Sequence, residues 1–168
     1  LIFAADSLRP SSRASTGVAA MRLAPGACLV GMVVLPPADA DAAAAVAGDP
    51  GGGAAVLLVT KQGLAKKIRA ADLRTMRRAG QGVRGVRLVP GDALAAVLPV
   101  PARSDAGRDL LVGTAAGVML RTPQSAVATY SRSAKGVRLV RLDEGDAVQT
   151  VTVLSAEEAE AEEAVGGG

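Results

Sequence analysis

One phrase decides the fold of this chain, and its clearest copy reads Arg78-Ala79-Gly80-Gln81-Gly82-Val83-Arg84-Gly85-Val86-Arg87-Leu88, closed by Gly91-Asp92. Two further copies begin at Arg13 and Arg132. When the three Gly-Val pairs are aligned, an Arg stands four residues before each Gly and an Arg-Leu pair begins five residues after it. The pairs are 65 and 54 residues apart. A period of this size in strand-rich sequence predicts an array of propeller-like units.

The middle copy lies in the most complete unit, and the upstream half of that unit also recurs. The stretch from Leu57 to Gly63 matches the stretch from Leu110 to Gly117. Apolar runs punctuated by Gly turns predict four antiparallel strands that form one blade. These strands are predicted at 56–60, 64–68, 83–89 and 93–100, with a helical turn at 70–74.

The rest of the chain divides into blades, linkers and a tail. Tracts rich in Pro, Ala, Gly and Asp predict flexible linkers, and an acidic, alanine-rich end predicts disorder. The predicted division is a partial blade at 1–35 with strands at 18–23 and 29–35, a flexible linker at 36–55, a complete blade at 56–100, a linker at 101–109, a complete blade at 110–154 and a disordered acidic tail at 155–168.

The strand predicted after the third Gly indicates how the units pack. Its one face presents Val137 and Leu139, and its other face presents Val140 and Leu142. Because a sheet wetted on one side should alternate apolar and polar residues, this strand is expected to be covered on both sides. The sequence therefore favours an all-β fold of propeller-like blades stacked around an axis, with a β-sandwich as the second choice.

Composition excludes several classes of chemistry. The 168 residues contain no His, and Cys28 is the single cysteine, so imidazole catalysis, an internal disulfide and a thiolate metal cage are excluded. The longest apolar stretch, 28–35, is far shorter than the roughly 20 residues of a membrane span. No nucleophile elbow, phosphate loop or acidic metal cluster occurs, and Tyr130 is predicted to be a filler or surface residue. We expect a soluble, non-catalytic stretch of a longer protein.

Charge points instead to a polyanion partner. The net charge is +3, but the last fourteen residues hold five Glu, so the nineteen Lys and Arg face only eleven acids in the rest of the chain, a net +8. Between Lys61 and Arg87, nine Lys and Arg accompany one acid, Asp72. A block of this kind is the electrostatic footprint of a nucleic-acid partner, and its alternative is a solvated face that only aids solubility. The acidic tail is expected either to compete for this basic surface or to serve solubility.

The Arg before each Gly-Val is the main candidate for phosphate contact, because a guanidinium can grip a phosphate in fork geometry. For the later Arg an ion pair with the turn acid is the alternative, as between Arg87 and Asp92 or Arg141 and Asp146. The candidate DNA contacts are the basic residues of these segments. They are Arg13, Arg22, Lys66, Lys67, Arg69, Arg74, Arg77, Arg78, Arg84, Arg87, Arg121, Arg132, Lys135 and Arg138.

The repeat resembles the C-terminal domain of the A subunit of DNA gyrase, in the type IIA topoisomerase family. Units of that family read Thr-x-x-Gly, a basic pair before a connecting segment, an Arg, Gly-Val, and then Leu-x-x-Gly-Asp. The middle unit carries Thr60 to Gly63, Lys66-Lys67, Arg78, Gly82-Val83 and Leu88 to Asp92. The next unit carries Thr114 to Gly117, Arg121, Arg132, Gly136-Val137 and Leu142 to Asp146.

Some positions depart from the family pattern. Residues 76–82 are a degenerate echo of the basic box Gln-Arg-Arg-Gly-Gly-Lys-Gly that the family carries in its first blade. Ala27 stands where the turn Asp is usual, and Ala128 stands where the other copies have an Arg. These departures indicate that the three blades do not contribute equally to DNA contact.

The resemblance implies a six-bladed β-pinwheel, of which this chain would form about the last three blades and the acidic tail. It implies a basic rim that wraps double-stranded DNA without sequence preference and supports ATP-dependent negative supercoiling by the gyrase holoenzyme. The implied partners are DNA, the B subunit of gyrase and a second copy of the A subunit, with no membrane. No cofactor is implied for this stretch, because ATP and Mg²⁺ would act elsewhere in the holoenzyme.

The implied location is the bacterial cytoplasm, or the interior of an organelle such as a chloroplast or mitochondrion. Two alternative functions stay open. The related subunit of topoisomerase IV shares the repeat, and a propeller of this kind could instead be a scaffold for protein partners.

Overall fold

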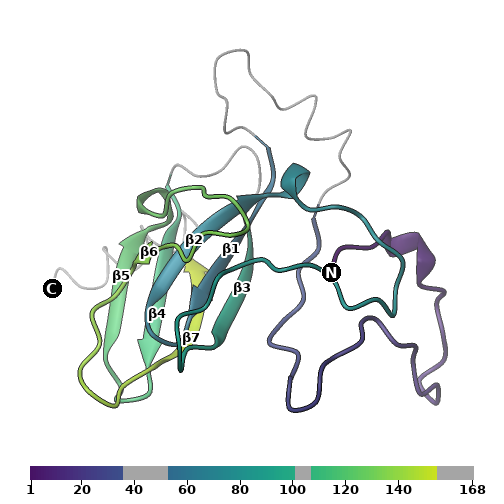
Figure 1. Ribbon diagram of the computed structural model, residues 1–168, viewed down its shortest axis with the longest axis horizontal. Coiled ribbons are helices and arrows are strands. Elements are labelled where there is room, and N and C mark those ends of the chain that lie inside the picture. Colours follow the sequence, from purple (N-terminus) through teal and green to yellow (C-terminus); the bar gives the residue numbers. More distant parts are fainter. Residues whose placement is uncertain (36–52, 101–106, 155–168) are drawn as a thin grey trace, which may run out of the picture.

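Two antiparallel sheets stand beside an extended N-terminal segment in the computed structural model (Figure 1), which describes residues 1–35, 53–100 and 107–154. We refer to these three stretches as unit 1, unit 2 and unit 3. The tail and most of both predicted linkers lie outside them. The helical elements of the described residues are single 3-10 turns: η1 (Ala5–Ser7), η2 (Ala70–Asp72) and η3 (Gln124–Ala126). The turn predicted at 70–74 is η2.

The first sheet draws its strands from two units. Its order is β3 (Leu94–Val100), β1 (Ala55–Thr60), β2 (Leu64–Arg69) and β6 (Val137–Arg138), with every neighbour antiparallel. Three of the strands predicted for unit 2 are therefore confirmed to within a residue. The fourth place is taken by a strand of unit 3, so a blade is completed by its neighbour.

The second sheet repeats this arrangement within unit 3. Its order is β5 (Met119–Pro123), β4 (Asp109–Thr114) and β7 (Val148–Leu154). The pairing register shifts between Gly113 and Thr114, and it shifts at the equivalent step of the first sheet, between Val59 and Thr60. The repeat read from sequence is thus also a structural repeat. Because Asp109 belongs to β4, the linker predicted at 101–109 ends earlier than expected.

Four predicted strands are absent or shortened. The described segments 18–23, 29–35 and 83–89 belong to no named strand, and the strand predicted at 137–142 ends at Arg138. For the strand predicted at 137–142, the cause of the early end lies at Gly63. Its carbonyl accepts both the Leu139 amide at 2.8 Å and the Val140 amide at 3.3 Å. One carbonyl that takes two successive amides ends a ladder, and the chain turns across the β1–β2 hairpin instead of continuing along its edge.

The Gly of the Gly-Val pair allows β6 to reach β2. Gly136 has a φ of +89°, and a Cβ on it would lie 2.5 Å from the Ala65 carbonyl oxygen. Only glycine combines this backbone conformation with so close an approach. The next residue, Val137, then pairs with Ala65 in the sheet. The motif glycine is therefore a site of contact between units.

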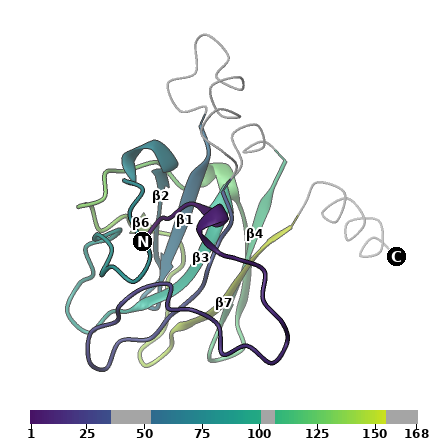
Figure 2. The ribbon, with the colours of Figure 1, turned by 90° about the vertical axis from the view of Figure 1, so that its right-hand side faces the viewer.

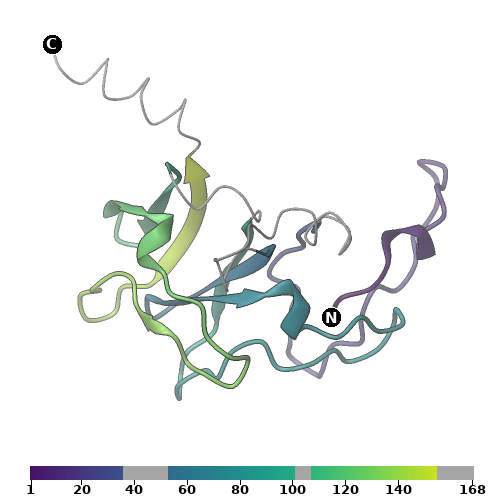
Figure 3. The same cartoon turned by 90° about the horizontal axis from the view of Figure 1, so that it is seen from above.

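Strand β1 is buried along its whole length because both of its faces are covered. On one face Leu57 and Val59 pack against Leu110 and Val112 of β4, so this core lies between the two sheets. On the other face Val56, Leu58 and Ile68 form a second core, which Val33 and Leu35 of unit 1 help to cover. Figure 3 shows the first sheet between the second sheet and unit 1, and Figure 2 shows unit 1 passing over it from the other side.

The two-sided burial predicted for residues 137–142 is wrong for that segment. Val137 is 36% exposed, whereas Leu139, Val140 and Leu142 all pack against the core between the sheets. Periodicity assigned these side chains to two faces because it assumed a straight strand. The sheets are stacked as the pattern suggested, but the strand that is covered on both faces is β1.

The units contact one another through repeated hydrogen bonds. We call residues 75–80 of unit 2 and 129–134 of unit 3 the docking segments, since each lies on the unit before it. At the first junction Met76 donates its amide to the Ile2 carbonyl at 2.8 Å, and at the second Tyr130 donates to the Lys67 carbonyl at 2.9 Å. These pairs occupy equivalent positions of the repeat.

A second pair of bonds repeats in the same way. Arg22 donates its amide to the Gly80 carbonyl at 2.8 Å, and Arg87 donates to the Ala134 carbonyl at 3.2 Å. The two junctions therefore share one geometry, which the repeat in the sequence imposes.

Gly63→Ala should destabilise the protein more than Gly117→Ala, the same change at the equivalent position of unit 3. Both glycines have positive φ, +77° and +85°, but a Cβ at position 63 would lie 2.7 Å from the Val140 carbonyl oxygen, whereas one at 117 meets nothing within 4 Å. We expect a loss of about 3–4 kcal/mol at position 63 and about 1–2 kcal/mol at 117. Urea unfolding measures both, and equal losses would contradict the contact between Gly63 and unit 3.

Candidate nucleic-acid interface

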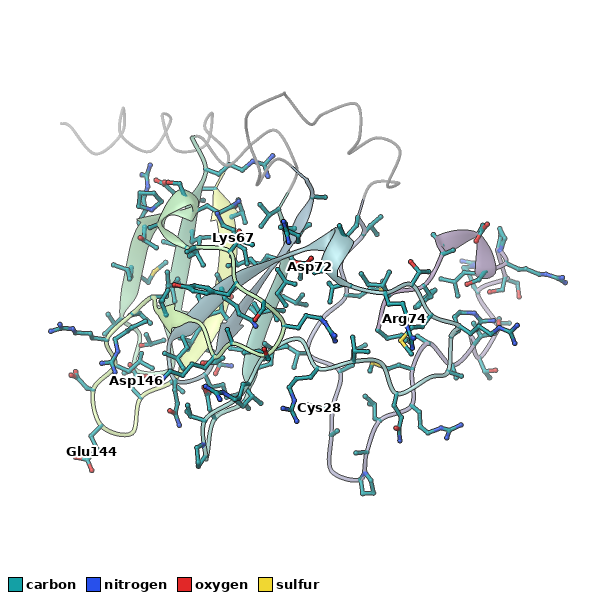
Figure 4. The ribbon with its side chains drawn as sticks, turned by 45° about the horizontal axis from the view of Figure 1, so that its top comes forward. Cys28, Lys67, Asp72, Arg74, Glu144 and Asp146 are labelled. Atoms are coloured by element: carbon teal, nitrogen blue, oxygen red, sulfur yellow. The ribbon has the colours of Figure 1, made fainter. Side chains whose placement is uncertain are left out.

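Most of the predicted basic contacts lie on the surface, on the docking segments or the Gly-Val segments that follow them. Eleven of the fourteen candidates are exposed, and nine of these eleven form no ion pair with another described residue. These nine are Arg13, Arg22, Arg74, Arg77, Arg84, Arg87, Arg132, Lys135 and Arg138. Figure 4 shows Arg74 on the chain that leads from Asp72 toward unit 1. Their positive charge is thus available to an external anion.

The three arginines that precede Gly-Val are not equivalent in structure. Arg13 and Arg132 are exposed, whereas Arg78 is partly buried and donates from Nη1 to the Ala19 carbonyl of unit 1 at 3.1 Å. One nitrogen of the Arg78 guanidinium is therefore engaged in holding two units together. The register of the repeat predicts the same role for all three arginines.

Two other candidate arginines are paired with acids. Arg69 makes a two-pronged contact with Asp72, with Nε–Oδ2 and Nη2–Oδ1 distances of 3.1 Å. The hydrogen bonds and charge of Asp72 raise the pKa of the Arg69 guanidinium. Arg121 pairs with Asp109 across β4 and β5 at 2.6 Å. These two cations carry compensated charge, so they offer less to a phosphate than the nine exposed cations that have no ion pair.

Lys66 was a candidate DNA contact, and the structure corrects that prediction. Its side chain is fully buried, and its Nζ donates to the carbonyls of Ser131 at 2.8 Å, Arg132 at 3.1 Å and Ala134 at 2.8 Å. Burial lowers the pKa of this ammonium group. The three acceptors use all three of its protons, so Lys66 cannot contact a phosphate.

Lys67 is also withdrawn from the surface, with an exposed fraction of 3% (Figure 4). Its backbone carries the second junction, since its amide donates to Ala128 and its carbonyl accepts from Tyr130. The basic pair that looked like a surface feature in the sequence is therefore internal. It is buried because the docking segment of unit 3 covers strand β2.

The turn acids do not pair with the arginines of their own turns, so the ion-pair alternative is wrong among the described residues. Oδ1 of Asp92 accepts the amides of Gln62 at 3.0 Å and Ala93 at 2.8 Å. Asp146 does the same with Ala116 and Ala147, at 3.0 and 2.7 Å (Figure 4). Each acid ties its turn to the tip of its own hairpin.

A hollow of about 380 Å³ lies at the first junction. Its lining comes from η1 and the preceding residues of unit 1 and from the docking segment of unit 2, and it includes the two basic residues Arg77 and Arg78. At the second junction the positions equivalent to its lining residues Ala4 and Ser7 are Arg69 and Asp72, which pair with each other. The second junction therefore carries an ion pair where the first carries two small uncharged side chains.

The register of the repeat also identifies two arginines that were left out of the candidate set. Arg9 is equivalent to Arg74, and Arg141 is equivalent to Arg22 and Arg87; both are exposed. Strict use of the repeat would have included them. Tyr130 is 36% exposed and takes part in the second junction through its backbone amide.

The described parts of the chain contain neither a cluster of metal ligands nor a membrane-spanning helix. Units 1 to 3 contain no group of three His, Cys, Asp or Glu side chains capable of holding a metal ion. Within the same residues, no helix has the length and apolar character needed to cross a membrane.

Stacked antiparallel sheets, a strand exchanged between units and a repeated basic docking segment define a repeat protein of the propeller class. The family model described as "DNA gyrase C-terminal domain, beta-propeller" matches residues 1–36, 54–101 and 108–155. These three stretches correspond to the three units and make up most of the chain. The chain belongs to this family.

Curated relatives agree with this assignment. The A subunit of DNA gyrase from Synechocystis sp. is 33% identical over 168 aligned residues, which cover 89% of this chain and 19% of that protein. The A subunit of DNA gyrase from Neisseria gonorrhoeae is 29% identical over 157 residues, covering 92% of this chain and 16% of that protein. The chain thus spans less than a fifth of the length of these relatives.

Solved structures share the fold. The C-terminal domain of DNA topoisomerase IV superposes with a TM-score of 0.67 at 16% identity, covering 89% of this chain and 42% of that one. The C-terminal domain of E. coli ParC gives a TM-score of 0.56 at 20% identity, covering 81% and 49%. At these identities the likeness concerns the fold alone, and it confirms the propeller-like all-β architecture.

Asp146→Asn should remove an acid-dependent part of the stability. The pKa of Asp146 is held below its ordinary value first by a hydrogen bond from the Thr114 side chain and then by backbone amides. A depressed pKa in the folded state means that the stabilisation is complete above about pH 4 and is lost as the pH falls through the folded pKa. Thermal unfolding between about pH 7 and about pH 2.5 should show a smaller acid-induced loss in the variant. Asp143→Asn in the same turn keeps Asp146 and serves as the control. An identical dependence of thermal stability on pH in all three proteins would contradict the stabilising role of the Asp146 hydrogen bonds.

Proposed function

We propose that this chain binds double-stranded DNA through the exposed basic side chains of its docking and Gly-Val segments. The observation that carries the proposal is that nine such side chains recur along equivalent segments of successive units and have no acidic partner among the described residues. Family membership supports the same function. Affinity would come from neutralising phosphates and releasing their counterions.

The proposed binding does not read base sequence. Base edges in the major groove are read by side chains that a helix or a two-stranded ribbon carries into the groove. The helical elements of units 1 to 3 are single 3-10 turns, and the exposed cations without an ion pair, other than Arg138, lie outside the helices and strands. Segments outside helices and strands can follow a phosphate backbone, which positions a duplex without specifying its sequence.

A repeated cationic surface on a stack of units would bend DNA around itself. We propose that this wrapping serves ATP-dependent negative supercoiling by a DNA gyrase holoenzyme, in which the partners are the B subunit of gyrase and a second copy of the A subunit. The two curated relatives described above, both A subunits of DNA gyrase, favour this role over that of a topoisomerase IV subunit. A bacterial cytoplasm, or an organelle of bacterial descent, would be the corresponding location.

The direct test is duplex binding as a function of salt, with Arg132→Gln/Lys135→Gln as the variant. Each phosphate contact contributes about 0.9 to the slope of log K against log salt, so a fourfold rise in salt costs about 3.5-fold in affinity per contact. We expect the variant to lose about two contacts, with a correspondingly shallower slope. The control is Arg69→Gln/Asp72→Asn, which removes a neutral pair and should leave the slope unchanged.

The outcomes separate the candidate functions. Two duplexes of equal length and different sequence should bind within a few-fold of each other, and a thousandfold preference would exclude phosphate-based recognition. Ligation of a nicked circle in the presence of the intact protein should change the linking number of the product if DNA is wrapped. A folded protein that shows no salt-dependent duplex binding would point to the protein-scaffold alternative.

A further inference from the structure

Lys66 is a buried ammonium group that holds a docking segment by three of its carbonyls. We propose that Lys66 is a positioning residue: it fixes the backbone of residues 131–134 so that Arg132 and Lys135 face a DNA phosphate together. This inference rests on the proposed function. In this inference the buried Lys66 does not contact DNA itself. It sets the positions of the residues that do.

Packing alone does not require a lysine at this position. The equivalent residues are Leu1 in unit 1 and Leu120 in unit 3, and both are partly buried. An ammonium group is costly to bury, and it is tolerated only when hydrogen bonds replace its water. What Lys66 adds beyond a leucine is therefore a three-way hold on backbone oxygens 65 to 68 residues further along the chain.

The held backbone carries the exposed cations directly. Two of the three acceptors, Ser131 and Arg132, are exposed residues, and Lys135 follows the third, Ala134. The Ala134 carbonyl also accepts the amide of Arg87, another exposed cation, at 3.2 Å. One buried ammonium group thus links Arg87, Arg132 and Lys135 through the backbone that bears them.

The direction of the carbonyls favours an anion on the outer side of the segment. Carbonyl oxygens carry partial negative charge and would repel a phosphate. Here three of them point inward to the Lys66 ammonium group, so that the side chains of Arg132 and Lys135 dominate the outer surface.

The first junction achieves its hold by a different contact. There the equivalent side chain is apolar, and the guanidinium of Arg78 is itself bonded to Ala19 of unit 1. At the second junction Lys66 supplies the hold, which leaves the equivalent Arg132 exposed. The first junction is thus held by the arginine of the motif, and the second by a buried lysine.

The test is a double-mutant cycle on duplex binding with the intact protein. Lys66→Met keeps most of the aliphatic stem and removes the three hydrogen bonds. We expect it to weaken duplex binding about three- to tenfold and to lower the salt slope by about 1 to 2. In an Arg132→Gln/Lys135→Gln background the same change should have a much smaller effect, limited to the contact of Arg87, whose amide is bonded to the Ala134 carbonyl. Lys61→Met, which removes an exposed charge from the β1–β2 turn, is the charge-matched control and should cost less than about twofold.

An additive effect of Lys66→Met in the doubly substituted background would overturn the proposal, because it would show that the lysine acts through its own charge or through general stability. Unchanged binding by folded Lys66→Met would overturn it as well. Should Lys66→Met fail to fold, Lys66→Gln replaces it in the cycle. Its amide can satisfy at most two of the three carbonyls, so a smaller change in the same direction is expected.

Amide hydrogen exchange without DNA separates this inference from the proposed function. Lys66→Met should exchange faster at residues 131–135 and at Arg87, while the β1–β2 hairpin amides keep their protection. Unchanged exchange at these amides would show that Lys66 does not restrain the backbone of residues 131–134. If the wild type does not bind duplex DNA at any salt concentration, the proposed function fails and the positioning role fails with it; the exchange result then decides only whether Lys66 holds the segment.

Discussion

The structure depends on one close approach between units, at Gly136. There the chain of unit 3 comes so near to β2 of unit 2 that a Cβ would lie 2.5 Å from the Ala65 carbonyl. This contact lets Val137 join the first sheet, and the carbonyl of Gly63 then ends the ladder by accepting two successive amides. The first sheet is consequently a joint product of two units, and the docking segment of unit 3 follows from that exchange.

The exchange also decides which charges face the solvent. When the docking segment of unit 3 lies on β2, it covers Lys66 and Lys67, whose burial could not be read from their charge. The same segment carries Arg132 on its outer side, with Lys135 directly after it. Where an acid lies nearby, as Asp72 beside Arg69, the cation is compensated within the unit. The surface offered to a polyanion is therefore set by contacts between units as much as by composition.

Equivalent positions of the repeat serve different purposes in successive units. Arg78 holds unit 1 through the Ala19 carbonyl, whereas Arg132 is exposed and its backbone is held by Lys66. The turn acids, by contrast, keep one purpose, since Asp92 and Asp146 both bind the amides of their own hairpin tips. Local contacts repeat faithfully because they lie within one unit. Contacts across a junction vary because either partner can change.

Sequence by itself determined the all-β class, the repeat register, the strands β1, β2 and β3, and the basic character of the chain, because apolar periodicity and turn glycines are local signals. It also identified most of the arginines that stay exposed, although not Arg9 and Arg141. Only the tertiary structure decided that the strand after Gly136 joins another unit, that residues 83–89 form no strand, and that Lys66 and Lys67 are internal. The physical reason is that these outcomes depend on hydrogen-bond partners far away along the chain, such as the carbonyls of 131–134, and no local pattern records where such partners lie.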